Sequence, residues 1–543
     1  MKYRAIFDDV EDVEEKDGNL KPWQINLIVF AAIALIVNLM AVIYVNLCRD
    51  IYYWSNADCW DIARKLADGS IGMPVWKAVY QSILNGEFNY VPSLLSALFA
   101  KLFGNSRMVF ILSLVNCYLI PSYILIYLLA KKLGKAPLIT MLTVIFTVPV
   151  ILYLTFNGFT EMGGFVLCLI CFYIYFAIDE KKLSVVSYIG IGIVLSLLIL
   201  WNSWYLFFSV SFITSMTAYA ILFRKRPYMC LITLATAVAF LACFFNGYMF
   251  RHLLSAYGES KFEFNIILNL RVITRYLGLV FIIGMIAGSG AMVKNNDSRP
   301  IFVWLQILIC YVSFTSTKIH GQGHLLMYVP GLVILMILSV KYIKTEKLLL
   351  TVIIFALIQS ASVFLPRTQP KSTEEIKHIS LIPSFSMKAR KRDSAYDILA
   401  LKSKLDSIIP EGQYLGVLAY SDILNSDMLK NAEPSLNLKQ YRIGYIANTI
   451  PYFDLPEVNL NPLCNANYML VAYPAQYIRE NQKVLRAAVD SFASWSDIAM
   501  AYEEMYEYAT VIDGTEMKLY HRIRDVSGPE LAQFRYKLNN FNN

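Results

Sequence analysis

An apolar run followed directly by an acidic, aromatic loop decides the fold. The run is INLIVFAAIALIVNLMAVIYVNL, Ile25–Leu47, and the loop begins CRDIYYWSNADCWDIARKLADG, Cys48–Gly69. About 20 consecutive apolar residues cross a bilayer as an α-helix, so the run predicts a membrane span. The loop then places three carboxylates, Asp50, Asp58 and Asp61, among tyrosines and tryptophans. A loop that only joined two spans would need none of these side chains.

Composition places the whole chain among membrane proteins. Of its 543 residues, 57% are hydrophobic and 16% are charged, with a mean hydropathy of +0.49. The net charge of +8 mostly reflects lysine and arginine in cytoplasmic loops, so we expect no nucleic-acid partner. The sequence has no Walker A motif and no glycine-rich dinucleotide fingerprint, which argues against direct use of a nucleotide. The nine cysteines include no CxxC pair or Cys/His cluster that would predict zinc.

Apolar runs of near-bilayer length recur along the first two thirds of the chain. We predict about eleven spans, which are Ile25–Leu47, Met108–Ala130, Pro137–Phe156, Met162–Ile178, Val185–Leu200, Tyr205–Phe223, Met229–Met249, Ile273–Ala291, Ile301–Thr315, Leu325–Val340 and Leu348–Leu365. Their interiors hold almost no ionisable residues, which argues against an ion-coupled transporter.

Lysine and arginine indicate which loops face the cytoplasm. They gather in alternate loops, at Lys131–Lys135, Lys181–Lys182, Arg224–Arg226, Lys294–Arg299 and Lys341–Lys347. The positive-inside rule assigns these loops to the cytoplasm. We therefore predict a cytoplasmic N-terminus, an outward-facing acidic first loop, and an extracytoplasmic C-terminal part. A plasma membrane, bacterial because the loops are short and no organelle address is found, is the expected location.

The chain divides by composition into four parts. Residues 1–24 form an acidic cytoplasmic N-terminus, 25–365 the membrane part, 366–393 a basic linker, and 394–543 a small extracytoplasmic α/β domain. In the last part, periodicity predicts helices and buried strands, and Asp513-Gly514 predicts a hairpin turn. The predicted elements are helices Ala395–Ile409 and Ala475–Phe492 and strands Tyr414–Tyr420, Tyr468–Tyr473, Thr510–Ile512 and Met517–Ile523.

Several short outer segments carry a family resemblance. They are WDIARKL at Trp60–Leu66, NYVP at Asn89–Pro92, LFGNSR at Leu102–Arg107, GFTEMGG at Gly158–Gly164, and HGQGH at His320–His324. In this order and context, the membrane part resembles the GT-C superfamily of polytopic glycosyltransferases, which includes protein O-mannosyltransferases and lipid A aminoarabinose transferases. The family places an acid about seven residues before the Ile-Ala-Arg stretch. That register falls here on Ser55-Asn56, and the nearest acids are Asp58 and Asp50.

The resemblance implies a fold and a reaction. The fold would be an α-helical polytopic membrane protein of GT-C type with a small extracytoplasmic α/β domain. The enzyme would be a hexosyl- or pentosyltransferase. It would move a sugar from a polyprenyl-phosphate carrier to a glycan, lipid or protein acceptor at the outer membrane face, with inversion. No cofactor is certain, and a divalent cation, Mg or Mn, is left open.

Three acids are candidates for the catalytic site. Asp58 is a candidate general base, because a base must reach the attacking hydroxyl and an apolar wall would suit its pKa. Its alternative role is that of a solvated loop residue or helix cap. Asp50 is a second candidate base, with a salt bridge to Arg49 as the alternative. Asp61 is interpreted as structural. Glu161 is a candidate second acid that orients the acceptor or binds a divalent ion, or else a side chain that offsets a helix dipole.

The candidate substrate-binding residues lie in the later outer segments. Lys318, His320, Gln322 and His324 are candidates for recognising the donor phosphate or sugar. Arginine neutralises phosphate through bidentate contacts, and a phosphate leaving group needs such stabilisation. The residues assigned to this role are Arg251, Arg271 and Arg275, with Tyr257 in the same loop as a sugar-pocket residue. Contact with lipid headgroups is the alternative for all of them.

The rest of the first outer loop, which spans residues 48–107, predicts contact with membrane lipids. Val75–Phe103 is amphipathic and is expected to lie along the bilayer surface, where it would wall the groove for the lipid carrier. Three other functions remain open. They are an O-antigen-type polysaccharide polymerase or ligase, a non-enzymatic carrier of lipid-linked sugars, and a pseudoenzyme, which Ser55 and Asn202 suggest.

Overall fold

The computed structural model describes most of the chain. The described residues are 21–53, 55–85, 89–134, 137–177, 184–224, 227–248, 265–316, 321–342, 346–365, 378–410, 412–435, 460–477 and 482–540. The chain divides into two compact units. The first comprises Met1–Tyr44 and Cys59–Lys388, and the second comprises Val45–Asp58 and Ala389–Asn543. The acidic N-terminus predicted at residues 1–24 falls largely outside the described residues.

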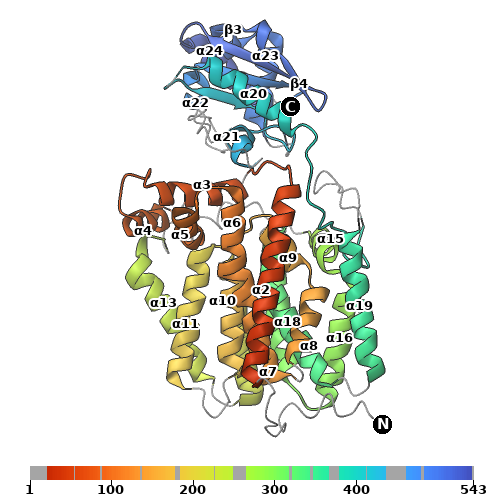
Figure 1. Cartoon of the computed structure of the whole chain (residues 1–543). Helices are drawn as coiled ribbons and strands as arrows, with labels where there is room; N and C mark the ends of the chain where they lie inside the picture. Colours follow the sequence, from red (N-terminus) through yellow and green to blue (C-terminus); the bar gives the residue numbers. More distant parts are fainter. Residues whose placement is uncertain are drawn as a thin grey trace. The chain divides into compact units, whose positions relative to one another are not determined.

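The first unit is a bundle of apolar helices (Figure 1). Its helices are α2 Pro22–Leu47, α6 Arg107–Leu114, α7 Ile120–Leu133, α8 Pro137–Thr147, α9 Val150–Phe156, α10 Met162–Phe172, α11 Val185–Trp201, α12 Tyr205–Tyr219, α13 Tyr228–Tyr248, α15 Ile266–Leu277, α16 Leu279–Lys294, α17 Arg299–Thr315, α18 Val329–Tyr342 and α19 Glu346–Phe364. Short π-helical segments continue α6, α10 and α12 at Val115–Leu119, Tyr173–Ala177 and Ala220–Arg224. The predicted helical, polytopic fold class is confirmed.

Some helices of the bundle are long enough to cross a membrane. Four described helical stretches are long and apolar enough to cross a bilayer: Trp23–Leu47, Arg107–Leu133, Tyr205–Phe223 and Tyr228–Phe245. Two bent helix pairs, α8 with α9 and α15 with α16, bring the number to six if each pair is one span. Six further apolar helices have 10–17 residues. The chain is therefore a multi-pass membrane protein, and the count of eleven spans stays a prediction.

Two of the predicted spans are broken, which corrects the sequence analysis. The stretch Pro137–Phe156 bends by 66° between α8 and α9, where Pro149 provides no backbone N–H to continue the first helix. The stretch predicted as Ile273–Ala291 bends by 89° between α15 and α16. There Gly278 has a φ of 78°, and a β-carbon on it would lie 3.0 Å from the Leu381 carbonyl oxygen. Such a conformation at such close range requires glycine.

Three shorter helices gather at one end of the bundle, across its axis (Figure 1). They are α3 Ser55–Asp68, α4 Val75–Asn85 and α5 Leu94–Phe103, with a 3₁₀ turn at Val91–Ser93. The last two confirm the predicted helices in Val75–Phe103. Large apolar side chains stay exposed on both, including Trp76 at 72% and Phe103 at 67%. This pattern is typical of helices that lie in a membrane surface.

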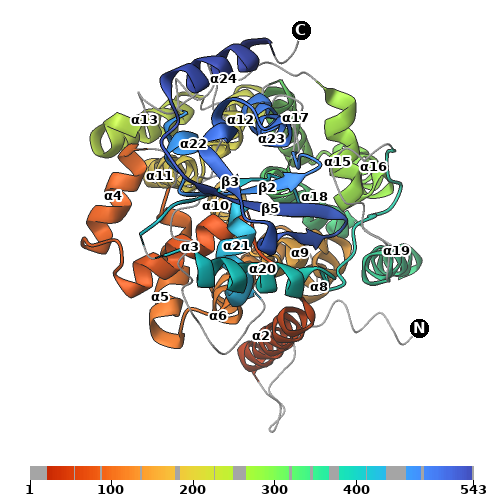
Figure 2. The same cartoon turned by 90° about the horizontal axis from the view of Figure 1, so that it is seen from above.

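The second unit is a five-stranded sheet between two layers of helices (Figure 2). The strands are β1 Leu415–Leu418, β2 Tyr468–Tyr473, β3 Tyr502–Glu504, β4 Thr510–Ile512 and β5 Thr515–Arg522. Their order is β1-β2-β5-β3, and β4 pairs with β5. The β1–β2 pair is parallel, and β5 is antiparallel to each of its neighbours.

Alternate residues of the strands enter two separate cores. Val417 and Leu470 pack with α20, Ala395–Ile408, and α21, Ser426–Ser435. Leu418 and Met469 pack on the opposite face with α22, Asn461–Asn465, α23, Lys483–Ser494, and α24, Gly528–Asn540. Two buried faces explain why these strands read as continuous apolar runs. The predicted small α/β domain is confirmed, including the Asp513-Gly514 hairpin.

One predicted helix of this unit is wrong in its extent. Helix Ala475–Phe492 was expected, and the structure begins α23 at Lys483 and leaves Ala475–Tyr477 outside a helix. Gln476 instead continues the strand layer, since its carbonyl accepts a hydrogen bond from the Tyr420 N–H at 2.8 Å. The apolar spacing of Ala475 and Tyr477 reflects packing against the core, not helical periodicity.

Candidate functional site

Three segments that are far apart in the sequence meet in the first unit. They are the end of the loop before α10, the turn between α11 and α12, and the segment Gly321–His324. Trp201 Nε1 donates a hydrogen bond to the Thr160 carbonyl at 3.0 Å, and the Tyr205 hydroxyl donates to the Glu161 carbonyl at 2.9 Å. These two bonds fix the backbone on either side of the Glu161 amide.

Glycines at the start of α10 permit this close packing. A β-carbon on Gly163 would lie 2.0 Å from the Trp201 ring, and one on Gly164 would lie 2.2 Å from the Tyr205 ring. Any side chain at either position would therefore displace an aromatic ring. The two glycines that follow Glu161 in the GFTEMGG motif thus allow the Trp201 and Tyr205 rings to pack against the start of α10. The aromatic residues of WNSWY, Trp201–Tyr205, were not predicted as site residues.

The Glu161 carboxyl faces the Gly321–His324 segment. A β-carbon on Gly323 would lie 3.3 Å from Glu161 Cδ and 3.4 Å from the Phe159 ring. Glu161 is partly exposed as a residue, but its carboxyl is surrounded by protein, and this desolvation raises its pKa above the usual range. The structure therefore brings together two predicted candidates, Glu161 and the segment of His324.

His324 is held in one orientation by its neighbours. Its Nδ1 accepts a hydrogen bond from the Gly321 N–H at 2.7 Å. Its ring lies 5.0 Å from the Trp204 ring and 4.7 Å from the Phe314 ring, measured between centroids. A neutral imidazole whose Nδ1 accepts carries its proton on Nε2. The orientation of the His324 ring is therefore fixed by a hydrogen bond and two aromatic contacts.

We call the group formed by Glu161, Gly323 and His324 the corner. Helix α3 contacts Thr160, the residue before Glu161, through Cys59. The Thr160 hydroxyl donates to Cys59 Sγ at 3.2 Å, and the Ser93 hydroxyl donates to the Cys59 carbonyl at 2.8 Å. Asp58 is the preceding residue, partly buried in the first turn of α3. A carboxylate in that turn is stabilised by the helix dipole.

Asp61 lies one turn further along α3 and is engaged in ion pairs. Its carboxylate contacts Arg64 at 2.9 Å and Lys65 at 2.6 Å. The Arg64 guanidinium also lies 4.7 Å from the centroid of Trp60, which is buried. These contacts support the structural interpretation of Asp61.

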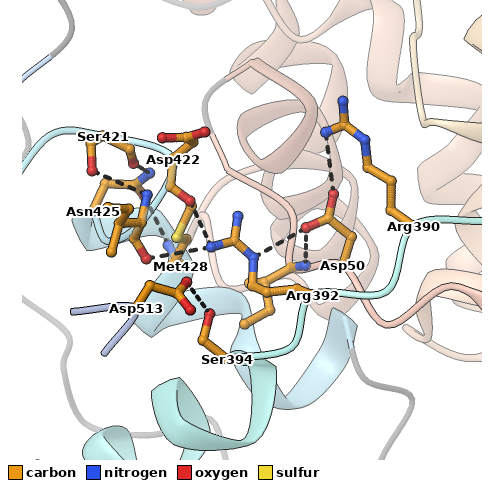
Figure 3. Close-up of polar contacts among 11 residues, drawn as sticks. Asp50, Arg390, Arg392, Ser394, Ser421, Asp422, Asn425, Met428 and Asp513 are labelled. Atoms are coloured by element: carbon orange, nitrogen blue, oxygen red, sulfur yellow. Dashed lines mark hydrogen bonds and ion pairs between the residues drawn. The ribbon is translucent and has the colours of Figure 1, made fainter. Parts of the chain in front are cut away.

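Asp50 belongs to the second unit, where two arginines flank its carboxylate (Figure 3). Arg392 Nε lies 3.3 Å from Oδ1, and Arg390 Nη1 lies 3.6 Å from Oδ2. The Ile51 N–H also donates to Oδ1 at 3.1 Å. The sequence analysis considered Arg49 as the partner. Arg390 and Arg392 were missed because they lie 340 and 342 positions after Asp50, and no local pattern signals such a pairing.

Two predicted arginines lie on the short amphipathic helix α15. Arg275 is only 8% exposed, and its Nε atom is buried without a hydrogen-bond partner among the described residues. Its guanidinium carbon lies 5.8 Å from the centroid of the Tyr276 ring. Arg271 precedes it by one helical turn and is partly exposed.

The remaining candidates are placed only in part. Gln322 begins the 3₁₀ turn Gly323–Met327 and is partly exposed. Arg251, Tyr257, Lys318 and His320 lie outside the described residues. Within the described ranges, no three His, Cys, Asp or Glu side chains are grouped as metal ligands.

Comparison with known proteins gives the fold. No protein-family model matches the sequence, and no curated protein matches it. The crystal structure of ArnT from Cupriavidus metallidurans in the apo state is similar, with a TM-score of 0.55, 10% sequence identity, and coverage of 92% of this chain and 98% of ArnT. ArnT bound to undecaprenyl phosphate gives a TM-score of 0.54, 12% identity, and coverage of 93% and 99%. The chain therefore shares the fold of ArnT over nearly the whole length of both proteins.

Proposed function

We propose that this protein is a glycosyltransferase that moves a sugar from a polyprenyl-phosphate carrier to an extracytoplasmic acceptor, with inversion at the anomeric carbon. The observation that carries the proposal is the corner of Glu161, Gly323 and His324 beside α3, in a fold shared with an ArnT that binds undecaprenyl phosphate. The acceptor would be a glycan, lipid or protein.

Asp58 is assigned as the general base. The acceptor hydroxyl oxygen attacks the anomeric carbon, and the bond from that carbon to the carrier phosphate oxygen breaks. The hydroxyl proton passes to the Asp58 carboxylate, and polyprenyl phosphate leaves with the bonding electron pair. A positioned base is typically worth 10²–10⁴-fold in rate. Asp50 is the weaker candidate, because the Ile51 N–H and the Arg392 guanidinium both occupy its Oδ1.

Glu161 and His324 are assigned to substrate orientation. The raised pKa of the Glu161 carboxyl favours hydrogen bonding to a sugar or acceptor hydroxyl over a permanent ion pair. His324 follows Gly323, which lies against the Glu161 carboxyl, and is proposed to contact the donor phosphate or sugar. Gln322, Lys318 and His320 complete the donor-recognition segment in this proposal.

Arg275 is assigned to the carrier phosphate. A buried N–H of a charged side chain is costly without a hydrogen-bond partner, because its desolvation is not repaid. The unpartnered Nε of Arg275 therefore supports an anionic ligand for α15. A phosphate that gains charge as the sugar departs would benefit from such a contact. Arg271, Arg251 and Tyr257 are proposed to extend this binding region.

The proposed chemistry takes place at the outer face. Lysine and arginine gather at the opposite helix ends, in the loops that the positive-inside rule assigns to the cytoplasm. The proposal therefore has a plasma-membrane protein with a cytoplasmic N-terminus and an extracytoplasmic C-terminal domain.

Sugar transfer in membranes tests the proposal. Membranes from cells that express the protein would receive radiolabelled polyprenyl-phosphate sugars and a crude envelope acceptor. Transfer of label that depends on the protein supports the proposal. A redistribution of the intact donor across the membrane without transfer would favour the carrier alternative, and chain-length growth of a glycan would favour the polymerase.

A further inference from the structure

The loop segment that leads from α2 into α3 is built into the second unit. Val45–Asp58 clusters with Ala389–Asn543, although both of its ends continue into the first unit. Ile51 is 1% exposed and lies in the same hydrophobic core as Ile398, Leu401 and Leu470. The second unit thus has a core residue supplied by the first outer loop.

Polar contacts hold the same segment on both sides of Ile51. The Arg49 N–H donates to the Arg390 carbonyl at 2.8 Å, and the Arg49 guanidinium lies 5.7 Å from the centroid of the Tyr396 ring. On the other side, the Arg392 guanidinium lies 5.9 Å from the centroid of Tyr53. Residues 49–53 are therefore fixed by main-chain, ionic and apolar contacts at once.

Arg392 is the centre of this arrangement (Figure 3). Its Nε faces Asp50 at 3.3 Å, and its Nη1 donates to the carbonyls of Asp422 and Ile423 at 2.6 and 3.4 Å. The Ser421 hydroxyl shapes that turn by accepting from the Ile423 N–H at 3.1 Å. One arginine therefore joins the first outer loop to the turn that leads into α21.

Because the ion pair of Asp50 and Arg392 is mostly buried, removing either partner is expected to disrupt the structure. The side chains of Asp50 and Arg392 are 16% and 12% exposed. Removing one partner from a pair this buried leaves an uncompensated charge, which is far more disruptive than the loss of a surface ion pair. Arg390, at 38% exposed, is the outer and more solvated partner.

We infer that Asp50 and Arg392 are positioning residues: their ion pair, with Ile51 in the core, makes the second unit hold the chain that enters α3, whose first turn carries Asp58. The inference rests on the proposed function for its effect on catalysis. Its structural part concerns the second unit alone. The consequence is that the part of the second unit formed by Ala389–Asn543 is required for transfer even though none of its residues is assigned to the chemistry.

A double-mutant cycle on the full-length protein tests this inference. The variants are Asp50→Asn, Arg392→Gln and the combination, with Glu504→Gln as control, since Glu504 pairs with Lys518 at 3.2 Å elsewhere in the same unit. Thermal unfolding and protease resistance of the segment around Tyr53 would be followed in detergent. The double variant is expected to lose no more than the more damaged single variant, because paired groups are not additive.

Transfer kinetics give the catalytic readout. Each single variant is expected to lower kcat between tenfold and about 10²-fold, the size expected of a small misplacement of reacting groups. The pH profile of kcat should keep its shape, because the base is still present. Glu504→Gln should leave kcat within about twofold of the wild type.

Two outcomes would overturn the inference. If Asp50→Asn removes the acidic limb of the pH profile while Arg392→Gln leaves kcat unchanged, Asp50 is itself the base. If unfolding and protease resistance match the wild type in all three variants, the pair does not hold the loop. If wild-type membranes transfer no sugar but the cycle is non-additive in stability, the proposed function fails and the positioning role stands.

Discussion

The carboxyl of Glu161 lies directly against Gly323, so close that a β-carbon on Gly323 would be 3.3 Å from Glu161 Cδ. These residues are 162 positions apart in the sequence. Their contact joins the loop before α10 to the segment that carries His324. Because of this contact, we treat the segments as one candidate site and not as separate loops.

Substitution of Gly323 by Ala is expected to push the Glu161 carboxyl aside by a few tenths of an ångström. We expect kcat for sugar transfer to fall about tenfold, because small misplacements of catalytic groups are costly. Gly284→Ala is the matched control, because a β-carbon at Gly284 meets no atom within 4 Å. Equal activity of both variants would show that the contact does not matter for transfer.

Glu161→Gln is expected to stabilise the protein at neutral pH. Burial raises the pKa of this carboxyl above its ordinary 4.5, so the folded state binds more protons than the unfolded state between the two values. Stability is then lost as pH rises through that window. The midpoint of thermal unfolding should therefore exceed that of the wild type at pH 8, and the difference should shrink towards pH 4.

Glu530→Gln gives a control of opposite sign for that experiment. The ion pair with Arg524 lowers the pKa of Glu530 to about 2, so its ionised form stabilises the folded state above pH 4.5 and loses this effect as pH falls towards 2. Glu530→Gln should therefore lower the unfolding midpoint at pH 8. The prediction for Glu161 fails if both variants shift in the same direction.

Arg275→Gln is expected to separate lipid binding from folding. Wild-type protein in detergent should unfold at a higher temperature when polyprenyl phosphate is added, because a ligand that binds only the folded state stabilises it. Arg275→Gln should lose most of this shift and raise KM for the donor. Arg299→Gln, which breaks an ion pair to Asp297, should lower stability while it keeps the lipid-induced shift. An undiminished shift in Arg275→Gln would place the phosphate elsewhere.

The predicted orientation can be tested with single cysteines. Ser407→Cys on α20 and Asn295→Cys after α16 both lie at exposed positions. With the exposed Cys243 replaced by serine, a membrane-impermeant thiol reagent should label Cys at position 407 in intact cells. Position 295 should react only after permeabilisation. The reverse pattern would put the proposed chemistry on the cytoplasmic side.

The sequence predicted what local patterns determine. Apolar length predicted the multi-pass membrane protein, and the continuous apolar run YMLVAY at Tyr468–Tyr473 predicted β2 with both ends correct. The hairpin at Asp513-Gly514 followed from turn chemistry, because that dipeptide accepts the positive φ values found there. The breaks at Pro149 and Gly278 were missed because hydropathy averages over a window and does not register one backbone conformation.

Contacts between residues far apart in the chain could not be predicted from the sequence. Asp50 was predicted as a candidate base, but its ion-pair partners Arg390 and Arg392 lie in what composition presents as a basic linker. A basic run is more often solvated than buried, and no local signal distinguishes the two. Tyr205 was missed for a similar reason, because an aromatic side chain at a helix end predicts an interface anchor before it predicts a hydrogen bond to Glu161.

Transfer of radiolabelled sugar by Asp58→Asn membranes, compared with wild type, tests the central claim most directly. Both would receive the same series of polyprenyl-phosphate sugars and the same envelope acceptor. The account predicts transfer by the wild type and a loss of about 10²-fold or more in Asp58→Asn, with equal protein in the membrane. Equal transfer by the two would contradict the role of Asp58 as the base, and no consumption of any donor by the wild type would contradict the transferase itself.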